Sequence, residues 1–373
     1  MGFQMIHYDP DFKDVSLDQR KSILRTLNLI CEHSEELRPS GVTQISLVHA
    51  IGSTLLGVDI SDEKSVNDRA KVMDDFAKNT ISINTRAKQR LFQLFILTEL
   101  ILDPIPYKAT ETLMEIANIL EVEDAFVDIA REYSMGAYGI VASDLHRKGY
   151  LGDPNLIKKG SEKMRIHKLL TDPFENDDDD PELLQQWINL EKCSDDTLGN
   201  NMWRYYIGRG FIFSGQKGSV NPTIAQHDWI HLLADYGTTV ENELEVFAFI
   251  GSSIPDLKGF SFLIAIVSLF ETGRLESWGN GALTADSGHL DLPGMPERLA
   301  DAIRRGRICN LDVMYGIDYF DYKDMPINEV RQKLGIPPKS GDVDSPGVWD
   351  QNGISNYQRE HGDKKYQPPL GNV

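Results

Sequence analysis

Apolar residues in this chain recur at spacings of three and four, and no segment keeps the every-second-residue spacing of a half-buried strand. Residues 16–37 carry such a helical stripe, and residues 87–102 form a strongly apolar segment that Pro104 and Pro106 end. Residues 257–272 contain the most apolar run of the chain, residues 260–270, which indicates a buried helix. The sequence therefore predicts an all-α fold.

The chain has 373 residues, enough for two helical domains of ordinary size. We expect a helical bundle over residues 1–150 and an acidic linker over residues 151–182, which contains the solvated run Asp177–Asp180. A second helical domain is expected over residues 183–338. Residues 339–373 hold many Pro, Gly, Asp and Asn residues and few aliphatic ones, so we expect an extended tail.

The formal net charge of −19 argues against a surface that binds nucleic acid, because such a surface needs clustered Lys and Arg. Three scattered cysteines without a CxxC pair predict a reducing compartment. No secretory or transit segment is recognisable at the N-terminus. The longest apolar run, residues 260–270, is too short to span a bilayer, which takes about 20 residues. We expect a cytoplasmic protein whose membrane contact, if any, is peripheral, at the inner face of a bacterial membrane.

The segment of residues 226–245, QHDWIHLLADYGTTVENELE, holds the strongest chemical signal. His227 and His231 are four residues apart, so on a helix they lie one turn apart on the same face, where two imidazoles can share a divalent metal. Asp228 lies about 100° around that helix and can reach the same site or orient one of its ligands. We therefore interpret the segment as a candidate metal site.

Glu243 joins this site only if the helix breaks. On an unbroken helix it would lie about 18 Å from His231, too far to share an ion. Gly237 is placed to end the first helix, and Thr238 with Glu241 matches a capping box that begins a second one. These residues form a connector between two helices, and they predict that the chain reverses there and brings Glu243 back to the histidines.

Other interpretations stay open at this point. Two histidines on an apolar helix are often core residues with satisfied hydrogen bonds. A zinc protease requires Glu where Asp228 stands. Phosphohydrolases with an adjacent His-Asp pair need further distant ligands, and His146, His167 and His289 lack a recognisable context for that role.

The motif HDWIHLLADYGTTVENE resembles the His-Asp-x-x-His-x11-Glu signature of the ubiquinone (coenzyme Q) biosynthesis protein family Coq-four. TLGNNMWRYY before the motif and the segment from Asp301 to Pro338 resemble that family as well, so the resemblance covers about residues 183–338. It implies a mostly helical fold and a divalent metal held by His227, Asp228, His231 and Glu243. Zinc is the ion usually assigned, and iron, manganese and magnesium remain open.

The resemblance further implies removal of the C1 carboxyl group from a polyprenyl hydroxybenzoate, coupled to hydroxylation there. Asp228 and Glu243 would be the catalytic acids, and an isoprenoid or quinone-like lipid would be the partner, together with other biosynthetic proteins; a homo-oligomer is also compatible with the sequence. Whether the chain is an enzyme is left open. The alternatives are a non-catalytic protein that binds lipid or organises a complex, and a metallohydrolase acting on another metabolite.

The N-terminal part and the C-terminal tail lie outside the region that resembles the Coq-four family. Because the chain departs from the family there, the resemblance does not identify its substrate. Residues 95–122 resemble the helical domains of tellurite-resistance B-like proteins. Glu99, Asp103 and Glu111 could bind a cation there. The alternative is that these acids cap helices and face solvent.

Overall fold

The predicted all-α class is confirmed by a computed structural model. The only strands in the part of the chain that it describes are β1 (Ser277–Trp278) and β2 (Leu283–Thr284), which pair antiparallel. The described residues are 8–31, 41–58, 68–123, 125–156, 158, 178–275, 277–278 and 283–369.

In the described ranges, the N-terminal half holds seven labelled helices. They are α1 (Leu17–Cys31), α2 (Gly41–Ala50), α3 (Arg69–Thr80), α4 (Thr85–Leu100), α5 (Tyr107–Leu120), α6 (Ala125–Ser134) and α7 (Tyr138–Lys148). A π-helical turn, Ile51–Leu56, extends α2. The apolar segment expected over residues 87–102 is α4, which is buried along most of its length because it lies between the other helices of this half.

The C-terminal half contains the remaining labelled helices. They are α9 (Pro181–Ile188), α10 (Leu198–Arg209), α11 (Pro222–Ala234), α12 (Val240–Ser253), α13 (Phe260–Phe270), α14 (Met295–Cys309), α15 (Ile327–Lys333) and α16 (Asn356–His361). The helix expected over residues 257–272 is α13, preceded by a 3-10 turn, and every residue of α13 is buried. None of the helices in the described ranges is long and apolar enough to cross a membrane.

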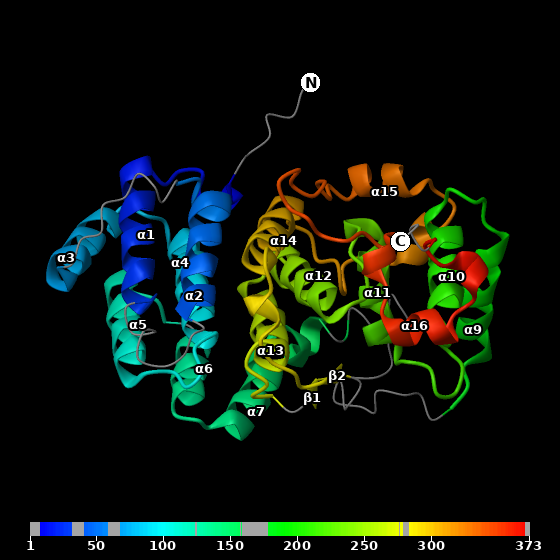
Figure 1. Ribbon diagram of the computed structural model, residues 1–373, viewed down its shortest axis with the longest axis horizontal. Coiled ribbons are helices and arrows are strands. Elements are labelled where there is room, and N and C mark those ends of the chain that lie inside the picture. Colours follow the sequence, from blue (N-terminus) through cyan, green and yellow to red (C-terminus); the bar gives the residue numbers. More distant parts are fainter. Residues whose placement is uncertain are drawn as a thin grey trace.

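Helices α13 and α14 lie between the two halves (Figure 1). The apolar side chains of both halves form one connected core, which runs from Phe12 to Val348. The division into two domains therefore stays a prediction, since no gap in the core separates the halves. Of the expected linker, residues 157 and 159–177 lie outside the described residues. Asp180 at its end accepts a hydrogen bond from the Leu183 backbone N–H and so caps α9.

Buried charges also join the halves. The Arg90 guanidinium of α4 lies 3.3 Å from the Asp11 carboxylate and donates to the Ile254 carbonyl oxygen at 3.1 Å. Arg307 of α14 lies 3.6 Å from Asp9 and 3.7 Å from Asp11. Both arginines are almost inaccessible to solvent, so each needs these acids to offset the cost of burial. The N-terminal half is thereby fixed against the helices that carry the site.

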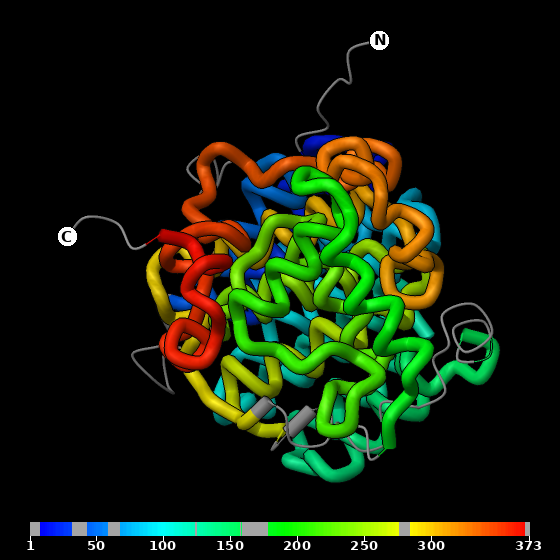
Figure 2. The backbone as a smooth tube through the Cα atoms, turned by 90° about the vertical axis from the view of Figure 1, so that its right-hand side faces the viewer, coloured from blue at the N-terminus to red at the C-terminus, as the bar shows by residue number. Residues whose placement is uncertain are grey.

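The expectation of an extended tail over residues 339–373 is corrected for residues 339–369. This segment folds back along α10 and contains α16 (Figure 2). Val348 and Ile354 are buried, and the Val348 backbone N–H donates to the Asp235 carboxylate at 3.1 Å. Few aliphatic residues suffice because the segment packs onto a surface that already exists.

Candidate metal centre

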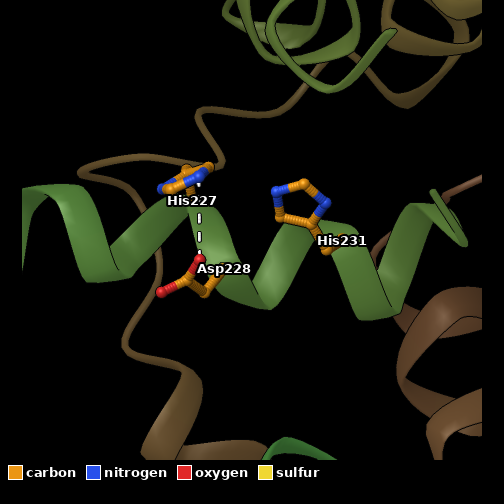
Figure 3. Close-up of side chains that lie close together, drawn as sticks. All are labelled: His227, Asp228 and His231. Atoms are coloured by element: carbon orange, nitrogen blue, oxygen red, sulfur yellow. Dashed lines mark ion pairs between the residues drawn. The ribbon is translucent and has the colours of Figure 1, made fainter. Parts of the chain in front are cut away.

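Helix α11 carries the first three candidate ligands. Asn221 caps its N-terminus by accepting hydrogen bonds from the next residues' backbone N–H groups, and Pro222 occupies the first turn. His227 and His231 lie one turn apart with ring centroids 5.2 Å from each other. One ligand atom from each of His227, Asp228 and His231 lies within 4.8 Å of the others, a group that could hold a metal ion (Figure 3).

The helix break predicted between His231 and Glu243 exists, but other residues make it. Helix α11 ends with Asp235 in the left-handed conformation, φ +59°, rather than at Gly237. Helix α12 begins after Thr239, one residue later than expected, and no capping box forms. The Thr239 hydroxyl donates instead to the Asn242 side chain at 3.0 Å. The chain still reverses, which is the consequence that matters for the site.

Glu243 returns to the histidines from the first turn of α12. Its Oε1 atom lies 3.4 Å from His231 Nε2 and its Oε2 atom lies 3.8 Å from His227 Nε2. The tighter group within 4.8 Å consists of the other three residues. Glu243 thus faces both imidazoles across the site, at distances typical of weak ion pairs rather than of short hydrogen bonds.

Both imidazoles are oriented through Nδ1. His231 Nδ1 lies 2.7 Å from the Gly237 carbonyl oxygen and donates to it, while His227 Nδ1 contacts the Ile224 carbonyl oxygen. A carbonyl oxygen accepts only, so each ring carries its proton on Nδ1 and leaves Nε2 for a ligand. His231 Nε2 and Glu243 Oε2 are buried atoms without a hydrogen-bond partner among the described residues. Such orphaned atoms fit a bound cation.

Asp228 is held by the preceding helix. The Tyr206 hydroxyl of α10 donates to Asp228 Oδ2 at 2.5 Å, and Asp228 Oδ1 lies 3.6 Å from His227 Nε2. Burial raises the pKa of Asp228, and the nearby histidines and the Tyr206 hydroxyl oppose that rise. One carboxylate oxygen is therefore fixed, and the other is turned toward the site.

His231 and Glu243 shift each other's pKa in opposite directions. Burial by itself lowers the pKa of His231, but Glu243, Asp228 and the Gly237 carbonyl together raise it, and the net shift is upward. Burial by itself raises the pKa of Glu243, but His231 and His227 together lower it, and the net shift is downward. The protein alone thus stabilises one positive charge between them. A divalent cation would supply that charge in place of the His231 proton.

The group opens into a cavity of 520 Å³. His227, Asp228 and Glu243 line one part of its wall, whereas His231 lies behind them. Most of the remaining wall is apolar and includes Phe211, Val220, Phe247, Phe262, Phe270 and Met314. Two of these, Phe262 and Phe270, come from α13, so this buried helix contributes side chains to the cavity wall as well as to the core.

The other candidates from the sequence are not brought together. Glu99 is fully buried and accepts from the Thr110 hydroxyl, Asp103 pairs with Arg274 at 2.7 Å, and Glu111 is exposed. No second group of side chains that could hold a metal ion (a metal-competent group) occurs in the described ranges.

Of the distant histidines, the two that the structure describes, His146 and His289, do not complete the site either. The two ring nitrogens of His289 lie against Glu241 and Asp286 at 2.9 and 3.0 Å, and His167 lies outside the described residues. His146 is not among the residues of the metal-competent group.

Residues that sequence reasoning missed come from elements flanking the motif. Tyr205 and Tyr206 of α10 line the cavity beside Asp228, and Thr238 and Gln358 line another part of it. The aromatic pair next to the motif is a signal that could have been used. Nothing in the sequence marks Gln358, which lies 115 residues after Glu243. No family model matches this chain, and neither a curated protein nor a solved structure shows significant similarity to it.

Proposed function

We propose that this protein binds one divalent metal ion, zinc in the first instance, through His227, His231 and the carboxylates of Asp228 and Glu243. The observation that carries the proposal is the pair of imidazoles that carbonyl acceptors orient so that their Nε2 atoms face the buried carboxylate of Asp228 and the partly buried carboxylate of Glu243. Two imidazoles with one or two carboxylates form a ligand set typical of catalytic zinc and of non-haem iron sites.

We further propose that the metal centre acts on an amphipathic ligand, a prenylated aromatic acid or a related lipid. The cavity wall combines a polar group at one position with aromatic and aliphatic side chains over most of the remainder. Such a surface favours a ligand with a polar aromatic end and an apolar extension. Ile212 and Tyr357 line the cavity and are both exposed to solvent, so a tail longer than the cavity has a way out beside them.

The proposed reaction is oxidative decarboxylation of a polyprenyl hydroxybenzoate-like acid. The C1 carboxyl group leaves as carbon dioxide, a hydroxyl group from water replaces it, and dioxygen is the external two-electron oxidant that is reduced to hydrogen peroxide. A bound divalent ion would supply Lewis-acid polarisation of the ligand's oxygen atoms. Glu243, whose pKa is lowered by His231, is present as a carboxylate and can accept a proton at the cavity wall. Asp228 keeps Oδ2 bound by Tyr206, so only its Oδ1 atom is available to the site.

Metal content tests the first part of the proposal. We expect about one metal ion per chain in protein purified without chelator, because the structure offers one preformed ligand group. The double variant His227→Ala/His231→Ala should lose that ion. His49→Ala, which removes an exposed histidine of α2, is the matched control and should keep it. A wild-type protein without metal after reconstitution with zinc, iron and manganese would contradict the proposal.

Substrate chemistry tests the second part. Lipids that copurify with the protein can be identified by mass spectrometry, and metal-loaded protein can be assayed for carbon dioxide release from a prenylated hydroxybenzoate. Binding without turnover would favour a lipid-binding or complex-organising protein. Hydrolysis of an unrelated ester or phosphate, with no affinity for prenylated acids, would favour a metallohydrolase.

A further inference from the structure

The C-terminal segment of residues 339–369 forms part of the cavity wall. Tyr357 and Gln358 of α16 line the same 520 Å³ space as His227 and Glu243. The segment also holds the connector between α11 and α12, because the Thr238 backbone N–H donates to the Gly353 carbonyl oxygen at 2.8 Å. It therefore lies beside the metal centre and can contribute side chains to a ligand.

The orientation of the Gln358 amide is fixed by two hydrogen bonds to its oxygen. The Ser355 backbone N–H donates to Gln358 Oε1 at 3.2 Å as part of a capping box that begins α16. The Thr238 hydroxyl donates to the same oxygen at 2.5 Å. A backbone N–H can only donate, so the side-chain atom that the Ser355 N–H contacts is the amide oxygen Oε1, and the other atom is the amide nitrogen Nε2.

The two N–H groups on Gln358 Nε2 remain to be used. No hydrogen bond from Nε2 occurs within the described parts of the chain, although the residue is only 9% exposed. Nε2 is not one of the solvent-inaccessible atoms without a partner, so water can reach its two donors when the cavity holds no ligand. Because Gln358 lines the cavity, an acceptor on a bound ligand can take the place of that water.

The other polar groups at the cavity differ from this amide. Asp228 and Glu243 carry acceptor oxygens, the Tyr206 hydroxyl is engaged by Asp228, and the Thr238 hydroxyl is engaged by Gln358. The hydroxyls of Tyr205 and Tyr357 also line the cavity and can donate, but no hydrogen bond of theirs to a described residue fixes the direction of the donor. Gln358 is therefore a neutral donor whose orientation is fixed through its own amide oxygen. A ligand oxygen with free lone pairs, such as that of a carboxylate or carbonyl, complements it.

We propose that Gln358 is a specificity-determining residue that donates a hydrogen bond from Nε2 to a carboxylate or carbonyl oxygen of the ligand held in the metal-site cavity. The inference rests on the proposed function for its aromatic acid ligand. It assigns to the C-terminal segment a direct part in ligand recognition.

The test uses the full chain loaded with cobalt(II), and para-hydroxybenzoate as the probe. Binding of the probe is measured by calorimetry, and metal affinity is measured separately by competition with a chelator. Gln358→Glu keeps an acceptor for Ser355 and Thr238 but removes both donors. Gln358→Met removes the donors without adding a charge that would repel the probe. Gln332→Glu, at an exposed position of α15, is the matched control.

We expect each Gln358 variant to bind the probe about tenfold more weakly or worse, with metal affinity unchanged and Gln332→Glu like wild type. Wild-type affinity for the probe in Gln358→Met would overturn the proposal. A Gln358 variant that loses metal together with the probe would also overturn the proposal, because Gln358 would then support the metal site instead of recognising the ligand. If the wild type binds no metal but Gln358→Met still weakens the probe, the proposed metal function fails while the role of Gln358 stands. Wild-type protein that takes up metal but not the probe rules out this ligand class.

Discussion

Replacing Tyr206 by Phe removes one oxygen atom from the metal centre without removing a ligand. The Tyr206 hydroxyl is buried, and its donor bond to Asp228 Oδ2 is 2.5 Å long. The neighbouring Tyr205 hydroxyl also interacts with Asp228, but it makes no hydrogen bond of normal geometry with a described residue. The variant therefore leaves a buried carboxylate oxygen without its donor and frees the carboxylate to rotate away from His227.

The size of the effect follows from the kind of bond that is lost. A hydrogen bond from a neutral donor to a buried carboxylate contributes about 1.5–3 kcal/mol. Residues that orient metal ligands typically change metal affinity by about ten- to a hundredfold, which equals roughly 1.4–2.7 kcal/mol. The two ranges agree, so we expect Tyr206→Phe to weaken zinc binding by about ten- to a hundredfold.

The assay is competition for zinc against a fluorescent chelator at fixed pH and salt. Tyr319→Phe is the matched control, because the Tyr319 hydroxyl is also buried and donates to the Val313 carbonyl oxygen at 2.8 Å. Its ring stacks on Trp229 of α11, so it tests whether any loss of a buried phenol near this helix loosens the site. We expect its zinc affinity to stay within about twofold of wild type.

Two results would refute the reasoning. Equal zinc affinity in Tyr206→Phe and wild type would mean that Asp228 is not oriented by Tyr206 when metal is bound. Equal losses in both phenylalanine variants would mean that general destabilisation of α11, not the bond to Asp228, lowers the affinity. Thermal unfolding of each metal-free variant separates the second result from a specific effect.

Further predictions concern stability and the connector. Burial raises the pKa of Glu99 from 4.5 to about 7, so between these pH values the folded state holds a proton that the unfolded state loses. The free energy of unfolding should therefore fall by about 1.4 kcal/mol per pH unit between about pH 5 and pH 7. Urea unfolding of Glu99→Gln should show a flatter pH profile. Gly306→Ala would place a Cβ atom 2.4 Å from the Phe249 carbonyl oxygen, so we expect a loss of about 1–3 kcal/mol in unfolding free energy, whereas Gly341→Ala meets no atom within 4 Å and should be neutral. Gly237→Ala would place a Cβ atom 2.4 Å from Gly353, so chelator competition should show weaker zinc binding as the C-terminal segment is pushed from the connector.

Local patterns predicted the helices and the first part of the site. Helix α13 followed from an apolar run, and the approach of His227 and His231 followed from a spacing of four residues, because both depend only on helical geometry. The connector was predicted only in its effect. Gly237 is the better intrinsic helix terminator, but Asp235 takes the left-handed position, where its carboxylate accepts a hydrogen bond from the Val348 backbone N–H. That partner is 113 residues away, and no local pattern reveals it.

The same distance explains why the C-terminal segment was misjudged. Its composition is poor in aliphatic residues, which is a sound reason to expect little independent structure. Composition does not reveal that the connector between α11 and α12 offers main-chain hydrogen-bond partners to this segment. The Gly237 N–H donates to the Pro346 carbonyl oxygen at 3.2 Å, and the Thr238 N–H donates to the Gly353 carbonyl oxygen. Gly237 in turn accepts the hydrogen bond from His231 Nδ1. The segment that the sequence marks as least structured is therefore hydrogen-bonded to the residue that orients His231, a candidate metal ligand, and its order and the order of the candidate metal centre depend on each other.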